Sequence, residues 1–170
     1  NTSLSITNLK NKNYRNAVIE KIIVKSDANG ANAFVEDAEL NFYETTEPVF
    51  KKQIKLSKNL SIAYSPSFES YIGTDNLFHY NSNYDISPLY EVNLYNNDGR
   101  PLQDKDQQGM VNSYIWDNEN QMLATCKAAA FNDMACTSLE TGEKGNWSYS
   151  ANSTPDPTAP TGGMCYHFVN

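Results

Sequence analysis

Hydrophobic and polar residues alternate along several short stretches of this chain, and a period of two predicts β-strands. Residues 18–25 are dense in Val and Ile, and residues 34–43 alternate clearly. The second stretch places four apolar side chains on one predicted face: Phe34, Ala38, Leu40 and Phe42. The Asn29-Gly30 pair between the stretches suits a turn with positive φ. We therefore predict a hairpin, with an amphipathic helix in the second stretch as the alternative.

Alternation continues through the middle of the chain. Further predicted strands cover 50–56, 60–64, 90–95, 111–116 and 122–127, each bounded by turn residues. Turn residues at 45–48 interrupt the pattern before these strands. Residues 66–88 are predicted to form a long loop or a short strand pair. Five aromatic residues are expected to anchor that loop: Phe68, Tyr71, Phe78, Tyr80 and Tyr84.

The two ends of the chain alternate less. Residues 1–16 are polar and predict at best a short alternating segment, which contains Leu4, Ile6 and Leu9. The Ala-rich segment 127–135 favours helix by propensity but is too short to be stable alone, so we predict a single helical turn. Residues 150–163 are expected to be a Ser/Thr/Pro/Gly loop, and 164–169 a closing strand.

Two nonapeptides, LYNNDGRPL at 94–102 and IWDNENQML at 115–123, match in character at an offset of 21 residues (115 minus 94). The corresponding pairs include Tyr95 and Trp116, Asn96 and Asp117, Gly99 and Asn120, Arg100 and Gln121, and Leu102 and Leu123. Self-similarity at a fixed offset indicates repeat architecture. Because the second copy lacks the Gly-Arg pair, we interpret it as a terminal repeat.

Composition supports an all-β fold and narrows the partners. Aromatic residues make up 12% of the 170 residues, and Asn is frequent, which favours strands and turns. A net charge of −7 argues against nucleic acid or an anionic membrane as partner, and no apolar run is long enough to span a membrane. Three cysteines, Cys126, Cys136 and Cys165, leave at least one unpaired, and we expect buried thiols rather than a bridge.

The two nonapeptides resemble the YD repeat of Rhs/YD-repeat proteins, in the form found in large secreted proteins of Bacteroidetes. The first copy carries the motif in Tyr95, Gly99, Arg100 and Leu102, and the second in Gly109, Tyr114, Asp117 and Leu123. The resemblance implies antiparallel hairpins whose aromatic and Leu side chains stack on the next copy. The second copy departs from the motif at Trp116, Asn120 and Gln121.

Residues 137–149, together with 160–163 and 165–166, resemble the opening of a jelly-roll-like module that often follows such repeats. The resemblance therefore implies a YD-repeat-like β-region at 1–127, a linker at 128–136 and the start of a β-sandwich or jelly-roll module at 137–170. Glu140 lies where such modules can place a calcium ligand. No other cofactor is expected.

Residues that could carry chemistry are few. His79 and His167 are the only histidines, and packed or exposed side chains without a catalytic role explain them more simply. The acidic segments 104–106 and 117–119 lack the spacing of an EF-hand and are interpreted as solvated turns. Three aromatic side chains could stack on sugar rings: Trp147, Tyr149 and Tyr166. For Trp147, the preferred alternative is a core position in the new module.

These features lead to one principal hypothesis and two alternatives. The chain contains no nucleophile elbow, zinc-protease motif, phosphate loop or dinucleotide fingerprint, so we expect no enzyme. The sequence has no initiator Met or signal peptide, so we expect a segment of a larger chain. The resemblance to Rhs/YD-repeat proteins implies that this segment is structural or adhesive and lies outside the cell or on its surface. The alternatives are a carbohydrate-binding module that recognises a cell-surface glycan, and part of a toxin-enclosing shell recognised by an outer-membrane secretion component.

Overall fold

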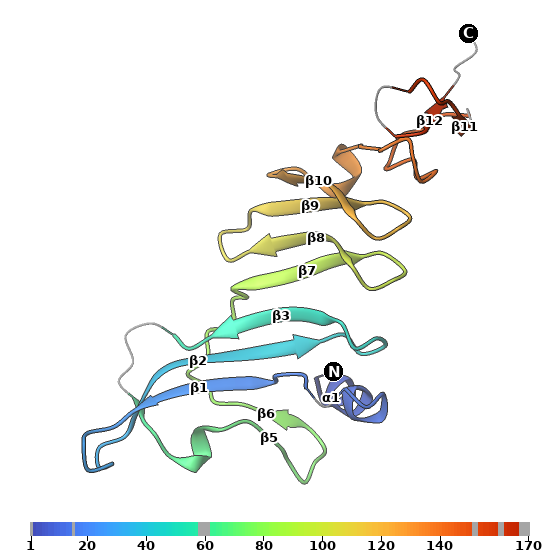
Figure 1. Cartoon of the computed structure of the whole chain (residues 1–170). Coiled ribbons are helices and arrows are strands. Elements are labelled where there is room, and N and C mark those ends of the chain that lie inside the picture. Colours follow the sequence, from blue (N-terminus) through green and yellow to red (C-terminus); the bar gives the residue numbers. More distant parts are fainter. Residues whose placement is uncertain (1, 15, 58–61, 151–152, 160–161, 167–170) are drawn as a thin grey trace. The chain divides into compact units, whose positions relative to one another are not determined.

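The chain folds into two compact units that are both rich in antiparallel strand pairs (Figure 1). The computed structural model describes residues 2–14, 16–57, 62–150, 153–159 and 162–166. The first unit comprises Asn1–Val92 with Asp106–Gln108, and the second comprises Asn93–Lys105 with Gly109–Asn170. The predicted all-β class is confirmed. None of the helices in the described part of the chain has the length and apolar character needed to cross a bilayer.

In the first unit, hydrogen-bonded strands follow the order β1 (Glu20–Lys25), β2 (Phe34–Tyr43), β3 (Phe50–Lys55) and β7 (Tyr90–Tyr95), and β7 continues into the second unit. The predicted hairpin of β1 and β2 is confirmed, with Gly30 at a φ of 73° in its turn. A two-residue strand, β4 (Ile62–Ala63), also pairs with β2. This strand lies within the strand predicted at 60–64, and residues 60 and 61 lie outside the described part of the chain.

A β-bulge in β2 corrects the predicted buried face. Ile23 pairs with Asp37 and Val24 with Val35, so Glu36 is an extra residue in the ladder. An extra residue reverses the side-chain alternation on one side of it. Val35 is therefore buried and Phe34 is 38% exposed, whereas Ala38, Leu40 and Phe42 are buried as predicted.

The core of the first unit lies on one face of β2 and β3. It contains eight residues that contact each other: Val35, Ala38, Leu40, Phe42, Ile54, Leu56, Phe68 and Tyr84. Phe68 belongs to the short helix η1 (Pro66–Phe68), and the strand pair β5 (Tyr71–Ile72) and β6 (Phe78–His79) follows it. The segment 66–88 thus forms the predicted short strand pair with aromatic anchors, although Tyr71 is 59% exposed.

The N-terminal segment forms a helix, α1 (Thr2–Asn11), where a short alternating segment was expected. Its Ser, Thr and Asn residues have weak helix propensity, so packing has to supply the stability. Ser5 and Leu9 are spaced by four residues, are 2% and 3% exposed, and lie on one helical face. The helix contacts β2. This tertiary contact is invisible in the local pattern.

In the second unit, the hydrogen-bonded order is β7, β8 (Pro101–Asp106), β9 (Val111–Trp116) and β10 (Met122–Lys127). The predicted strands 90–95, 111–116 and 122–127 are confirmed at their boundaries. The separate strand β8 was not predicted, because PLQDKD begins with proline and ends with three consecutive charged residues. Its Asp104 is nevertheless fully buried, which reverses the expectation of a solvated acidic turn at 104–106.

The remainder of the second unit has little regular structure. The helical turn predicted within 127–135 is the short helix η2 (Phe131–Asp133). A small hairpin of β11 (Ser153–Pro155) and β12 (Met164–Tyr166) corrects the loop predicted at 150–163, and residues 167–169 of the predicted closing strand lie outside the described residues. The expected linker 128–136 lies inside this unit, and the jelly-roll assignment stays a prediction. The three cysteines are half-buried, whereas buried positions were expected.

Candidate functional site

The two nonapeptides of the sequence repeat form equivalent strand-turn-strand structures. In the first turn, the Asn96 amide donates to the Arg100 carbonyl at 2.9 Å, and the Gly99 amide donates to the Asn96 carbonyl at 3.1 Å. In the second turn, the Asp117 amide donates to the Gln121 carbonyl at 2.9 Å, and the Asn120 amide donates to the Asp117 carbonyl at 3.1 Å.

The side chains that close these turns are also equivalent. Asn96 Oδ1 accepts the amides of Asp98 at 3.0 Å and Arg100 at 2.9 Å. Asp117 Oδ1 accepts the amides two and four residues later, at 2.9 and 2.7 Å. Gly99 has a φ of 77° and Asn120 a φ of 66°, and Asn is among the few residues that tolerate this left-handed region. The loss of glycine in the second copy therefore leaves the turn intact.

The other repeat residues pack around β8 and β9 in the second unit. The Arg100 guanidinium lies 5.0 Å from the centre of the Trp116 ring, and Trp116 Nε1 donates to the Pro101 carbonyl at 2.8 Å. Tyr95, Leu102 and Leu123 lie in strands β7, β8 and β10 and are half-buried. Gly109 has a φ of 84° in the turn between β8 and β9.

Tyr114 contacts a buried carboxylate that the sequence did not identify as buried. Its hydroxyl donates to Asp104, and Asn112 Nδ2 donates to the same carboxylate at 2.7 Å. Burial and then the hydrogen bond to Asp104 raise the pKa of Tyr114 to about 12. The tyrosine therefore remains a proton donor at neutral pH and satisfies the buried acid.

The three aromatic residues predicted to bind sugars are only partly brought together. The rings of Tyr149 and Tyr166 meet edge to face, with 5.2 Å between centroids, and Lys144 Nζ lies 4.8 Å from the Tyr149 ring. Trp147 is 55% exposed, so the alternative of a core position is wrong. Its indole joins neither tyrosine in a ring contact within the described part of the chain.

Glu140 binds a backbone amide. Its Oε2 accepts the amide of Gly163 at 2.9 Å, which ties the segment before β12 to residue 140. A side chain at Gly162 would come within 2.1 Å of this carboxylate, so only glycine fits there. No group of three or more His, Cys, Asp or Glu residues that could hold a metal occurs in the described ranges. A calcium role for Glu140 stays a prediction.

Three residues away, Glu143 is a buried carboxylate that the sequence analysis missed. Its Oε1 accepts three hydrogen bonds, from Thr137 Oγ1 at 2.8 Å, from the Ser138 amide at 2.6 Å and from Ser138 Oγ at 2.9 Å. Its Oε2 accepts a hydrogen bond from Thr141 Oγ1. Burial raises the pKa of Glu143, but the hydrogen bonds from Thr141, Thr137 and Ser138 outweigh that effect and lower it to about 2. The surrounding TSLETGE sequence, with its hydroxyl residues, was the available signal.

His79 is a partly exposed residue of the β5–β6 hairpin and contacts two other residues of that hairpin. Its Nε2 lies 3.0 Å from each carboxylate oxygen of Asp75, and its ring stacks on Tyr71 with 5.0 Å between centroids. The hydrogen bond from the Leu77 amide, followed by that with His79, lowers the pKa of Asp75. This arrangement stabilises the hairpin. His167 lies outside the described residues.

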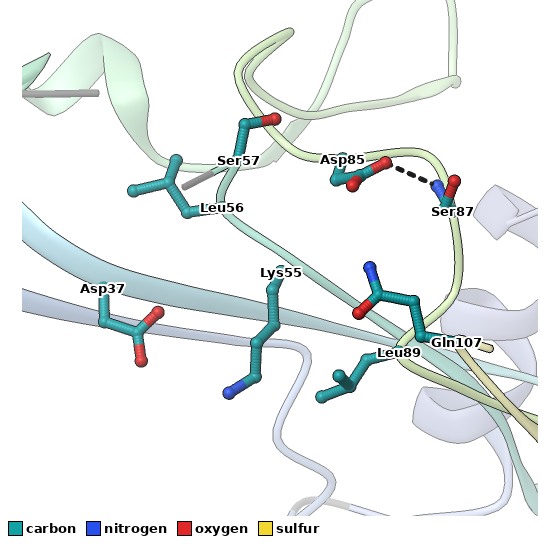
Figure 2. Close-up of a pocket in the computed structure, with 8 residues that line it drawn as sticks. All are labelled: Asp37, Lys55, Leu56, Ser57, Asp85, Ser87, Leu89 and Gln107. Carbon is teal, nitrogen blue, oxygen red and sulfur yellow. Dashed lines mark hydrogen bonds between the residues drawn. The ribbon is translucent and has the colours of Figure 1, made fainter. Parts of the chain in front are cut away.

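A cavity of about 610 Å³ lies in the first unit, and none of the predicted site residues lines it (Figure 2). Four segments line it: β2, the end of β3, the loop before β7, and the turn at residue 107. Its polar lining residues are Asp37, Lys55, Ser57, Asp85, Ser87 and Gln107. Leu56 and Leu89 supply apolar surface. Sequence reasoning could not find this site because its residues are far apart in the chain.

Comparison of the chain with protein-family models, with curated proteins and with solved structures gives no match.

Proposed function

We propose that this chain is a non-enzymatic structural segment of a larger extracellular or cell-surface protein, built from β-hairpins of the Rhs/YD-repeat type. The observation that supports it is the equivalence of the turns at Asn96–Arg100 and Asp117–Gln121, which share backbone bonds, capping oxygen and positive φ. A strand-turn-strand element repeated at a fixed offset extends a sheet by the same contacts each time. Such an element builds a scaffold.

The buried ionisable groups support a structural role. Asp104 and Glu143 are 0% and 7% exposed, and each carboxylate accepts hydrogen bonds from neighbouring side chains rather than facing a cleft. His79 is similarly engaged by Asp75 and Tyr71. A catalytic acid, base or nucleophile needs access to a substrate. These residues are used instead to hold loops and strands.

The coding sequence on either side of this chain tests the family proposal. We expect further copies of the Tyr-turn-Gly-Arg-Leu element in the parent protein, beyond the residues of this segment, and an export signal in that protein. Protease treatment of intact cells should remove the segment if it is displayed at the surface. An adjoining enzyme domain with no further repeats, or protection in intact but not lysed cells, would contradict the proposal.

Exposure of Trp147 favours a second candidate function, recognition of a cell-surface glycan. An indole that is 55% exposed offers an apolar face on which a sugar ring can stack. Affinity electrophoresis through gels containing polysaccharides tests it: the wild-type chain should be retarded and Trp147→Ala should not. Equal mobility of both proteins in every polysaccharide gel would remove this candidate.

A further inference from the structure

We propose that the cavity of the first unit binds a short neutral saccharide through its hydroxyl groups. This inference does not depend on the scaffold role, and its site is separate from Trp147. The cavity volume of about 610 Å³ is within the usual range for small-molecule sites, roughly 300–1,000 Å³.

Two carboxylates face the cavity with one oxygen each still available. Asp37 Oδ1 accepts the Ala38 amide at 2.9 Å, and Asp85 Oδ1 accepts the Ser87 amide at 2.9 Å (Figure 2). These bonds fix the orientation of both side chains. Within the described residues, the second oxygen of each carboxylate receives no hydrogen bond, so each can accept one from a ligand.

Alternation along β2 explains why Asp37 lies at this site. Ala38, Leu40 and Phe42 face the core, so Asp37 and Glu39 lie on the opposite face of the strand. Asp37 lines the cavity from that face. The bulge at Glu36 interrupts the alternation directly before Asp37.

Charges of both signs in the cavity favour a neutral ligand. Lys55 lines it as well, with Nζ 3.1 Å from Glu39 Oε1. An anion would be repelled by Asp37 and Asp85, and the Lys55 ammonium group reduces the attraction of these carboxylates for a cation. A ligand that both donates and accepts hydrogen bonds without net charge meets neither penalty.

The remaining lining groups match a polyol. The hydroxyls of Ser57 and Ser87 and the carboxamide of Gln107 can each donate and accept, and within the described part of the chain their side chains make no hydrogen bond. Leu56 and Leu89 provide apolar surface for the C–H face of a sugar ring. Hydroxyls at several ring positions, with C–H groups between them, are the chemistry of a saccharide.

Titration of the isotope-labelled full chain by amide NMR tests the proposal. The probes are the methyl glycosides of glucose, galactose, mannose and N-acetylglucosamine, with cellobiose, maltose and lactose. We expect at least one to shift the amides of Asp37, Ser57 and Ser87 with millimolar affinity. The shifts should persist at high salt, because a neutral ligand forms no ion pair.

The variants D37N and D85N keep the oxygen that accepts the backbone amide and replace only the available oxygen by an NH₂ group. Each should weaken binding about tenfold, as expected for the loss of one hydrogen bond in a site of this kind. E119Q makes the same charge change at an exposed turn position of the second unit and should bind as the wild type does.

Three results would overturn the proposal. The first is no shift of the cavity amides with any of the sugars. The second is binding that D37N and D85N leave unchanged, or that occurs at Trp147 instead. The third is a shift of the cavity amides by methylammonium, abolished by salt, without any effect of the sugars. None of these results bears on the scaffold role, which depends on the repeated turns.

Discussion

The two compact units are stabilised by different kinds of buried group. The first unit gathers apolar side chains around Leu40 and Ile54, which are 0% and 1% exposed. In the described part of the second unit, Ile115 is the buried hydrophobic residue, whereas Asp104, Ser113 and Glu143 are buried polar ones. Burial of apolar area is non-directional, but buried hydrogen bonds require one geometry. The contrast shows that antiparallel strands can be ordered by either means in one chain.

Truncation of a core side chain in the first unit should have the largest effect. Leu40→Ala removes a fully buried side chain and leaves a cavity, so it should lower the free energy of unfolding by about 2–5 kcal/mol. Chemical denaturation followed by tyrosine emission and far-UV signals measures this, because both tryptophans lie in the second unit. The matched control Ile86→Ala, at a residue that is 78% exposed, should change stability by less than about 0.5 kcal/mol. Similar values for both variants would contradict the apolar core.

The corresponding change in the second unit is polar. Glu143→Gln keeps the shape but replaces one acceptor oxygen by a donor, which leaves the Thr141 hydroxyl without its acceptor. The expected loss is about 1–3 kcal/mol, the usual cost of an unsatisfied buried group. Amide exchange of Ser138 and denaturation report it. If Glu143→Gln matched the exposed variant Glu119→Gln, the polar account of this unit would be wrong.

Lowering the pH should remove the stabilisation that the Glu143 carboxylate provides. The pKa of Glu143 is lowered in the folded chain, from 4.5 to about 2, so its stabilising effect is present above pH 4.5 and is lost as the pH falls toward 2. The stability difference between the wild type and Glu143→Gln should therefore be constant above that pH and shrink below it. Denaturation curves from pH 2 to 7 measure the difference. A difference that grew on acidification would have the wrong sign.

The two repeat turns should respond alike to loss of their capping oxygen. Asn96→Ala and Asp117→Ala each remove an acceptor for two backbone amides, at an expected cost of about 1 kcal/mol. Asp117→Ala should cost slightly more, because its hydrogen bonds are charge-assisted. Asn97→Ala, at an exposed position of the first turn, is the control. Thermal denaturation of the four proteins would refute the equivalence if only one turn were sensitive.

Sequence patterns predicted those parts of the molecule that local chemistry determines. Alternation located Tyr90–Tyr95 and Met122–Lys127 at their observed boundaries, and the offset of 21 residues identified two turns with equal hydrogen bonds. The helix at Thr2–Asn11 was missed because it packs against β2, a strand that is distant in the sequence. β8 was missed because nothing local reveals that Asp104 is buried.

The candidate sites show the same division. The exposed position of Trp147 and the burial of Glu143 depend on loops with positive φ at Leu139, Gly142 and Gly145, which no periodicity predicts. The cavity lined by Asp37 and Asp85 depends on four segments of the chain. The turns of the repeat, in contrast, are contained in five consecutive residues each, and their chemistry can be read directly.

Insertion of a third repeat tests the central claim most directly. A second copy of residues 96–116, placed after Trp116, continues into the Asp117 turn in phase. The residues that hold the C-terminal segment against β8 and β9 lie within this copy: Gln103, Val111, Ser113 and Ile115. Those contacts are therefore reproduced by the inserted strands.

The control inserts the same 21 residues at the same place in permuted order, 106–116 followed by 96–105, so that only the phase differs. We predict that the in-phase protein folds with added β-signal, a single cooperative transition and a melting temperature at or above that of the wild type. The permuted protein should lose the structure of the second unit. Equal loss of structure in both proteins would show that the two hairpins are not copies of one repeating element.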